Sequence, residues 1–277
     1  MSSGFSVLMS VYYKEKPDYF DLALHSILVD QTVLPNELVL ICDGPLTHEL
    51  DGVIEKYCLL FPTIIKLFRL EENGGLGRAL NFGLTKCSYP IVARADSDDI
   101  CVSTRFEIQT EYMKQHPDVS VISAYIDEFD EDWTKPFSEK RLPLDHESLM
   151  KRAKRRNPFN HMAVMFRRDD IIEAGSYQHV PYAEDYDLWV RTASRGKKFG
   201  NIDRVLVHAR VGNGMIGRRS NKAQIASWKI INDHLLEGHM INKLERFFNG
   251  IVIRVFVYMP KWAKKMAYEK VLRKKYD

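Results

Sequence analysis

The segment Asp96 to Asp99 could bind a metal ion in this sequence of 277 residues. It reads Asp-Ser-Asp-Asp and directly follows an apolar segment that predicts a buried strand. Asp96 and Asp98 are one residue apart, so their carboxylates can point the same way. Such oxygen ligands suit Mg²⁺ or Mn²⁺, which take further oxygens from a substrate phosphate. The alternative is a solvated acidic turn in which Asp99 or Ser103 caps the following helix.

A glycine-rich segment, Asn73 to Arg78, could bind an anion. Its three glycines precede a predicted helix, so backbone N–H groups and the positive helix end could face a phosphate that also pairs with Arg78. The spacing matches neither GxGxxG nor GxxxxGK[ST], which excludes those two phosphate-binding motifs. The alternative is that the glycines are there because the backbone needs a positive φ or has to pack closely at these positions.

Asp43 could accept hydrogen bonds from a base or a ribose. The alternative is that it is a turn residue, because Asp-Gly-Pro is typical of turns.

An acidic pair, Glu184 and Asp185, opens a predicted helix whose apolar face includes Leu188, Trp189 and Ala193. Acidic side chains at a helix N-terminus interact favourably with the helix dipole, so capping alone can account for the pair. The functional interpretation makes one of the two carboxylates a general base close to the metal site.

Apolar segments that predict strands precede most of these polar residues. The predicted strands are 5–11, 37–42, 64–70 and 91–95, with helices beginning at Pro17 and at Leu76. Continuously apolar strands separated by helices indicate an α/β protein with a mostly parallel sheet that helices cover on both faces. Ligands bind such sheets at the carboxyl ends of the strands, so the four following loops should meet at one site. These loops contain Tyr12 to Glu15, Asp43, Asn73 to Arg78 and Asp96 to Asp99.

The second half of the chain alternates less regularly. It predicts a helix over 105–116, a strand over 119–124, a loop or hairpin over 128–144, a basic helix that includes 151–156, a strand near 161–166, helices over 169–174 and 185–194, a strand over 199–208, and helices in the last 60 residues.

Composition and charge restrict the class of protein. With 45% hydrophobic and 28% charged residues, the chain is typical of a water-soluble globular protein, which excludes collagen, coiled coil and disorder. The four cysteines fit no metal or disulfide pattern and predict reduced thiols in a cytoplasmic protein.

The apolar run 251–259 is too short to span a bilayer, and no signal-peptide pattern is present. The net charge of +3 includes seven Lys or Arg residues over 261–277, which suits a surface anchor better than a nucleic-acid-binding domain.

Eight segments, in this order, resemble the family 2 glycosyltransferases of the GT-A fold, the inverting enzymes that build bacterial polysaccharides. They are SVYYKE, ILVDQT, LVLICDGP, NGGLGRALNFGL, ARADSDD, NHMAVMFRR, YAEDYDLWVR and HARVGNGMIGRR, and the resemblance extends from about Phe5 to Arg219. The chain most resembles the subgroup that assembles O-antigen and exopolysaccharide repeat units.

The resemblance implies roles for ten residues of this sequence. They are Val11 and Tyr12 at the uracil, Asp43 and Asp96 at the uridine, Arg78 near the nucleotide, Asp98 at the metal ion, Asp185 as the catalytic base, and His161, Glu184 and Arg210 facing the acceptor or donor sugar. Many relatives carry a histidine where this chain has Gly212, so the resemblance names no third metal ligand.

The activity that the resemblance implies is a metal-dependent transfer of galactose or glucose from a UDP-sugar. The expected cofactor is Mn²⁺ or Mg²⁺, and the expected acceptor is GlcNAc or GalNAc on a polyprenyl diphosphate, joined through a β1,3 linkage. Removal of the acceptor proton by Asp185 in a single displacement would invert the configuration. The alternatives are a phosphohydrolase with Asp96 as nucleophile, a nucleotidyltransferase, and a non-enzymatic membrane- or RNA-binding module.

We expect a catalytic domain over 1–219 and a helical extension over 220–277. In the extension, Ile251, Val252, Val255, Phe256 and Met259 can share one helical face, followed by the basic tail. This pattern predicts an interfacial helix on the inner face of the cytoplasmic membrane, with no nucleic-acid partner. The alternative is a helix packed on the domain. The basic run 151–156 is typical of a solvated helix face, and any ligand there should be an acceptor diphosphate or lipid head groups.

Overall fold

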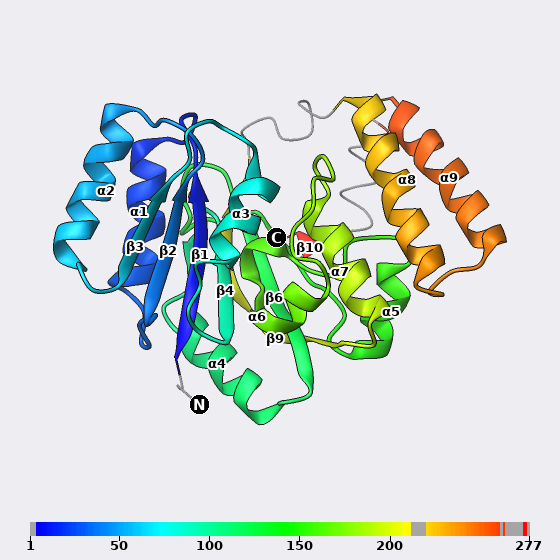
Figure 1. The fold of residues 1–277 in the computed structure, drawn as a ribbon, viewed down its shortest axis with the longest axis horizontal. Coiled ribbons are helices and arrows are strands. Elements are labelled where there is room, and N and C mark those ends of the chain that lie inside the picture. Colours follow the sequence, from blue (N-terminus) through cyan, green and yellow to red (C-terminus); the bar gives the residue numbers. More distant parts are fainter. Residues whose placement is uncertain (1–3, 212–219, 261–262, 264–273, 276–277) are drawn as a thin grey trace.

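The computed structural model describes residues 4–211, 220–260, 263 and 274–275, and a single twisted sheet forms its centre (Figure 1). Four parallel strands make one half of the sheet, in the order β3–β2–β1–β4. Their bounds are β1 Phe5–Val11, β2 Glu37–Cys42, β3 Ile65–Arg69 and β4 Ile91–Ala95. These strands match the predicted ones to within a residue at each end, and the α/β class is confirmed.

Adjacent residues of the parallel strands contribute to cores on opposite faces of the sheet. In β1, Val7 and Met9 join one core while Leu8 joins the other. The first core contains residues of α1 (Pro17–Leu28), α2 (His48–Leu60) and α4 (Arg105–Gln115), and the second those of α3 (Leu76–Leu84), α6 (Arg168–Glu173) and α7 (Glu184–Ser194). Because both faces are covered, β1, β2 and β4 are largely apolar rather than alternating, whereas β3 exposes Lys66 and Arg69. The helix α2 was not predicted.

The other half of the sheet mixes parallel and antiparallel pairs. Its strands are β5 Ile100–Cys101, β6 Val119–Phe129, β7 Ser138–Lys140, β8 Met165–Arg167 and β9 Lys198–Arg210. Strand β8 runs antiparallel to both β4 and β6, whereas β9 runs parallel to β6 and antiparallel to β5. The strand predicted near 161–166 is wrong in its first half, because His161–Ala163 form a 3₁₀ turn before β8.

Two further helices, α5 (His146–Ala153) and α8 (Asn221–Glu237), pack against α7. The helix α9 (Lys243–Tyr258) lies on the far side of α8 (Figure 1). Tyr186 and Val190 of α7 share a small core with Ile231 and Leu235 of α8, and α9 packs along α8. The expectation of helices throughout the last 60 residues is wrong at β10 (Lys274–Lys275), which pairs antiparallel with β7. An edge strand such as β7 offers free backbone groups, and these accept another strand. The domain boundary at 219 stays a prediction.

Within the described residues, none of the helices combines the length and the apolar character needed to cross a membrane. The four cysteines are free thiols, as the absence of a pairing pattern predicts. Burial raises the pKa of Cys42 to about 11 and that of Cys87 to about 12, so both stay protonated at neutral pH.

Candidate active site

The loops after β2 and β3 are joined through the carboxylate of Asp43. Asp43 is buried, and its backbone N–H donates to the carbonyl of Val11 at the end of β1, 2.8 Å away. Its two carboxylate oxygens accept hydrogen bonds from the backbone N–H groups of Gly74, at 2.8 Å, and Gly75, at 2.9 Å. The expectation that these glycine amides face a bound anion is therefore wrong for both, since they serve to orient Asp43. The side-chain amide of Asn73 also donates to the Asp43 carbonyl, at 3.1 Å.

The start of α3 lies against the start of α7. A Cβ atom on Gly77 would lie 3.3 Å from Cβ of Glu184 and 3.4 Å from the carbonyl oxygen of Gln178. The missing side chain thus allows the glycine-rich segment to approach the acidic pair closely. Arg78 points outward, where its Nη1 donates to Glu72 Oε1 at 2.8 Å, and both side chains are exposed. Arg78 is therefore accessible to a nucleotide, although it already has a carboxylate partner.

The turn after β4 gathers three carboxylates. Ligand atoms of Asp96, Asp98 and Asp99 all lie within 4.8 Å of one another. Asp99 is buried, and its Oδ1 accepts from the backbone N–H of Arg210 at 2.8 Å, so it does not cap the following helix. Its Oδ2 is buried without a hydrogen-bond partner among the described residues. Buried carboxylates are costly to ionise together, and a cation offsets that cost.

The electrostatics of this turn favour a divalent cation. Burial, together with the charges of Asp96 and Glu15, raises the pKa of Asp98 to about 7. Burial and the charges of Asp98 and Asp96 also raise the pKa of Asp99. The donor set consists of hard carboxylate oxygens, one of them unpartnered, and this is the set that Mg²⁺ and Mn²⁺ prefer. The three residues therefore fit such an ion, and Asp99 supplies a third carboxylate where the sequence named no third ligand.

Two charged residues that the sequence analysis did not assign support the acidic turn. The buried guanidinium of Arg94 pairs with Asp96, while its Nε and Nη1 have no hydrogen-bond partner among the described residues. The hydroxyl of Ser97 donates to Glu15 Oε2 at 2.7 Å, which brings the loop after β1 to the turn after β4. The signal for Arg94 was present in the sequence, because a charged residue inside an apolar strand needs a buried partner.

Arg210 holds the backbone around the acidic turn. Its guanidinium lies 3.6 Å from the ring centre of Tyr19 and 4.5 Å from that of Phe129. Nε donates to the carbonyl of Asp98 at 3.2 Å, and Nη1 donates to the carbonyl of Asp130 at 3.0 Å. Arg210 therefore positions the turn that carries the carboxylates. Contact between Arg210 and a sugar stays a prediction.

Asp185, the second residue of the acidic pair at the start of α7, is partly buried. The side-chain amide of Asn157 donates to Asp185 Oδ2 at 2.5 Å. Burial raises the pKa of Asp185, and the hydrogen bonds from Asn157 and from the backbone of Tyr186 oppose that rise, as does the charge of Arg94. A carboxylate with a raised pKa is suited to accept a proton near neutral pH.

His161 lies in the 3₁₀ turn before β8. Its Nε2 lies 2.9 Å from the hydroxyl of Tyr177, and its ring packs 6.1 Å from that of Trp189. Burial, and then the charge of Arg94, lowers the pKa of His161 well below its usual value, so the imidazole is neutral. The charge of Arg94 acts on His161, Asp98 and Asp185 alike, so these three predicted residues lie within electrostatic range of one buried cation.

Val11 and Tyr12 complete the edge at the carboxyl ends of the strands. Val11 ends β1 and is buried, whereas Tyr12 is half-buried with its ring 5.9 Å from that of Tyr13. The structure thus brings Tyr12, Asp43 and the acidic turn to neighbouring loops, as the predicted parallel sheet requires. Their roles toward a nucleotide stay predictions.

Solved structures share this arrangement of sheet and helices. TarS 1–349 of S. aureus, in its crystal structure with UDP-GlcNAc, matches with a TM-score of 0.69 at 18% identity, over 97% of this chain and 76% of that chain. The fold is the GT-A fold, and the chain is a glycosyltransferase of this class. Residues 6–175 match the model of Glycosyl transferase family 2, and the chain belongs to that family.

Two curated relatives extend over most of the chain. The amylovoran biosynthesis glycosyltransferase AmsE of Erwinia amylovora is 46% identical over 78% of this chain and 79% of its own length. A UDP-Gal:α-D-GlcNAc-diphosphoundecaprenol β-1,3-galactosyltransferase of Escherichia coli is 37% identical over 98% of this chain and 97% of its own length. The match with the second relative therefore includes the helices that follow residue 219 as well as the family domain.

Proposed function

We propose that this enzyme transfers galactose or glucose from a UDP-sugar to a GlcNAc or GalNAc that a polyprenyl diphosphate carries, through a β1,3 linkage, in O-antigen or exopolysaccharide synthesis. The observation that carries the proposal is the Escherichia coli relative, which aligns over 98% of this chain, the C-terminal helices included. The clustered carboxylates of the acidic turn and the raised pKa of the partly buried Asp185 support it.

The donor binds at the carboxyl ends of β1, β2 and β4. Val11 and Tyr12 contact the uracil, Asp43 and Asp96 accept hydrogen bonds from the uridine, and Arg78 approaches the diphosphate. The two glycine N–H groups that bind Asp43 fix its carboxylate before the nucleotide arrives. A carboxylate that is already oriented loses little side-chain entropy on binding.

Asp98 would hold Mn²⁺ or Mg²⁺, with Asp96 and Asp99 as neighbouring carboxylates. When bound, a divalent ion neutralises the negative charge that develops on the leaving diphosphate. Arg94 and Arg210 keep the turn in place, one through Asp96 and the other through the backbone of Asp98.

Asp185 acts as the general base. It accepts the proton of the acceptor hydroxyl while the hydroxyl oxygen forms a bond to the anomeric carbon and the bond from that carbon to the diphosphate oxygen breaks. Attack from the face opposite the leaving group inverts the configuration, so an α-linked donor gives a β-glycoside. Glu184, His161 and Arg210 face the sugars. The neutral imidazole of His161 can hydrogen-bond a hydroxyl without competing for its proton.

The helix α9 holds the enzyme on the inner face of the cytoplasmic membrane. Phe247 is 63% exposed and Val252 is 65% exposed, and Ile251 and Val255 are exposed as well. An amphipathic helix that exposes aromatic and aliphatic side chains is suited to lie in the head-group region of a bilayer. The basic tail over 261–277, which lies largely outside the described residues, adds attraction to an anionic leaflet.

Thermal unfolding with UDP and Mn²⁺, followed by transfer assays, tests this function. Ligands present at 100 times their dissociation constants stabilise a protein by about 2.7 kcal/mol, which moves the midpoint by several degrees. We expect this shift to need both ligands and to vanish in Asp98→Asn, while the matched control Asp169→Asn, whose side chain is 80% exposed, retains it. Mass and NMR analysis should then show a β1,3 product from UDP-galactose or UDP-glucose. A wild-type protein that neither shifts nor transfers either hexose contradicts the proposal.

A further inference from the structure

A turn of three cations, Lys154 to Arg156, follows α5 and is called the basic turn here. Arg155 and Arg156 are exposed, Lys154 is half-exposed, and none of the three forms an ion pair within the described part of the chain. Burial and the charge of Arg156 lower the pKa of the nearby Arg152, which adds a further cation beside the turn. Like charges gathered in this way favour an anionic ligand.

The basic turn is fastened to the start of α7. The hydroxyl of Tyr186 donates to the carbonyl of Ala153 at 2.7 Å, and Nε of Arg152 donates to the carbonyl of Asn157 at 3.0 Å. The Asn157 side chain in turn donates to Asp185 at 2.5 Å. Three residue steps separate Lys154 from Asn157, a span of at most about 10 Å. The cations and the catalytic carboxylate therefore lie one short turn apart.

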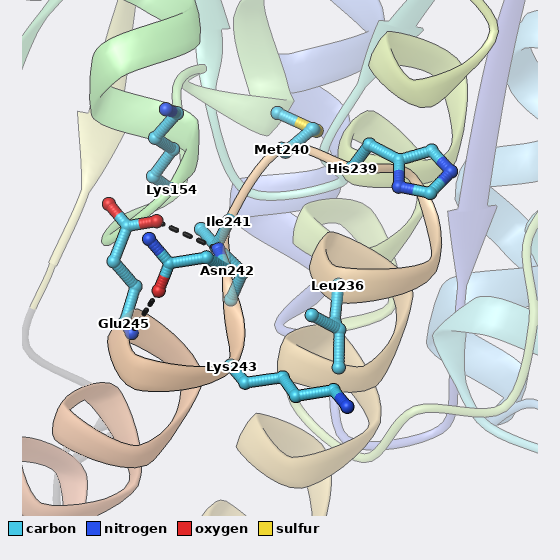
Figure 2. A pocket seen from close by; sticks show the side chains of 8 residues that line it. All are labelled: Lys154, Leu236, His239, Met240, Ile241, Asn242, Lys243 and Glu245. Atoms are coloured by element: carbon cyan, nitrogen blue, oxygen red, sulfur yellow. Dashed lines mark hydrogen bonds between the residues drawn. The ribbon is translucent and has the colours of Figure 1, made fainter.

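The other side of the basic turn meets α9. The side-chain amide of Asn249 donates to the carbonyl of Lys154 at 3.2 Å and to Oδ1 of Asn232 at 3.0 Å. Figure 2 shows Lys154 across from the loop that links α8 to α9, where the Asn242 capping box closes the start of α9. An open pocket of about 540 Å³ lies here, and its charged lining consists of Lys154, Lys243 and Glu245. The Glu245 carboxylate accepts the backbone N–H of Asn242. The exposed apolar side chains of α9 begin directly beyond it, at Leu244 and Phe247.

Three chemical environments therefore follow one another on this part of the molecule: an apolar helix, a cluster of cations and a proton-accepting carboxylate. A lipid-linked sugar has its apolar chain, its diphosphate and its reacting hydroxyl in the same order. We propose that the basic turn binds the diphosphate of the acceptor, with the lipid along α9 and the sugar hydroxyl at Asp185. The inference rests on the proposed function and adds the residues that distinguish a diphosphate-linked acceptor from a neutral glycoside.

The test compares Arg155→Ala/Arg156→Ala with Lys114→Ala/Lys135→Ala, which removes two exposed cations elsewhere in the chain. Each protein receives UDP-galactose or UDP-glucose and one of two acceptors: α-GlcNAc-diphosphate on a synthetic alkyl chain, or the same alkyl chain joined to GlcNAc without phosphate. We expect the arginine variant to raise the KM for the diphosphate acceptor about tenfold or more, because charge-assisted hydrogen bonds to the diphosphate are lost. The KM for the donor and the rate with the neutral acceptor should not change.

Binding to vesicles that contain phosphatidylglycerol separates acceptor diphosphate from lipid head groups. The arginine variant should bind these vesicles as the lysine control does. If it loses vesicle binding and keeps the wild-type KM for the diphosphate acceptor in detergent, the cations bind head groups and the inference is wrong. Equal acceptor KM values in both double variants also overturn it. A failure of the proposed function is recognised separately, because the wild-type enzyme would then transfer neither hexose to the diphosphate acceptor.

Discussion

The hydrogen bond from Asn157 to Asp185 should set the pH at which the enzyme gains activity. The amide donates to the carboxylate at 2.5 Å and so stabilises the ionised form of a group whose pKa burial raises. Hydrogen bonds to charged groups contribute about 1.5–3 kcal/mol, and 1.36 kcal/mol corresponds to one pKa unit. Asn157→Ala should therefore raise the pKa of Asp185 further, by about 1–2 units.

The sign of the effect on rate follows from the role of Asp185 as a base. A higher pKa leaves less of the ionised base at a given pH, so the acidic limb of the kcat/KM profile should move up by about 1–2 units. At pH values below the Asp185 pKa of both proteins, the variant should be about 10–100 times slower than the wild type. At pH values above both pKa values, it should approach the wild-type rate. The assay is kcat/KM for sugar transfer between pH 5 and 9 with saturating metal ion.

The matched control is Asn201→Ala. Asn201 is buried, whereas Asn157 is half-buried, and the Asn201 amide donates to the carbonyl of Pro143 at 2.8 Å. Both variants should lose about 1–2 kcal/mol of stability, since each leaves a buried group without its partner. Only Asn157→Ala should move the pH profile. A loss of rate that is the same at every pH, or an equal shift in the control, would refute the assignment of Asp185 as a base held by Asn157.

Three further predictions concern the fold and its surfaces. Gly44→Ala should cost about 1–3 kcal/mol in urea unfolding and weaken UDP binding, because φ is +86° and the new Cβ would lie 2.6 Å from a backbone nitrogen. Gly196→Ala, at φ +74° with open space around it, should cost less and leave UDP binding unchanged. Phe247→Glu/Val252→Glu should abolish sedimentation with anionic vesicles while the thermal midpoint stays within about 2 °C of wild type, because both side chains are exposed. Asp187→Ala should destabilise the protein by about 3–5 kcal/mol in the same unfolding assay, because this buried carboxylate holds both Arg191 and His234.

The order of strands and helices was largely predictable because burial on both faces makes β1, β2 and β4 largely apolar. The helix α2 was missed although Leu50, Ile54 and Tyr57 recur at helical spacing and Thr47 caps its first turn. Charged residues and Gly52 between these positions obscure the pattern. Strand β6 extends to Phe129, beyond its predicted end, because its last residues pair with β9, and that partner lies about 80 residues away in the sequence.

The site was predictable where a short motif carries its own chemistry. The aspartates after β4 and the acidic pair at α7 stand out in the sequence because several carboxylates occur within a few residues. Asn157 and Glu15 give no such signal, since each acts on a residue from a distant segment: Asn157 on Asp185, 28 positions away, and Glu15 on Ser97, 82 positions away.

The sequence by itself determined which residues lie at the carboxyl ends of the strands, because hydrophobic periodicity depends only on local spacing. Only the tertiary structure decided what those residues contact. The amides of Gly74 and Gly75 are hydrogen-bonded to Asp43, a pairing that depends on the register of β2 against β3. Asn157, which follows the basic turn, likewise meets Asp185 only because α5 and α7 pack together. Side-chain partners across a sheet or between helices are set by packing geometry, and a single sequence does not encode that geometry at any fixed spacing.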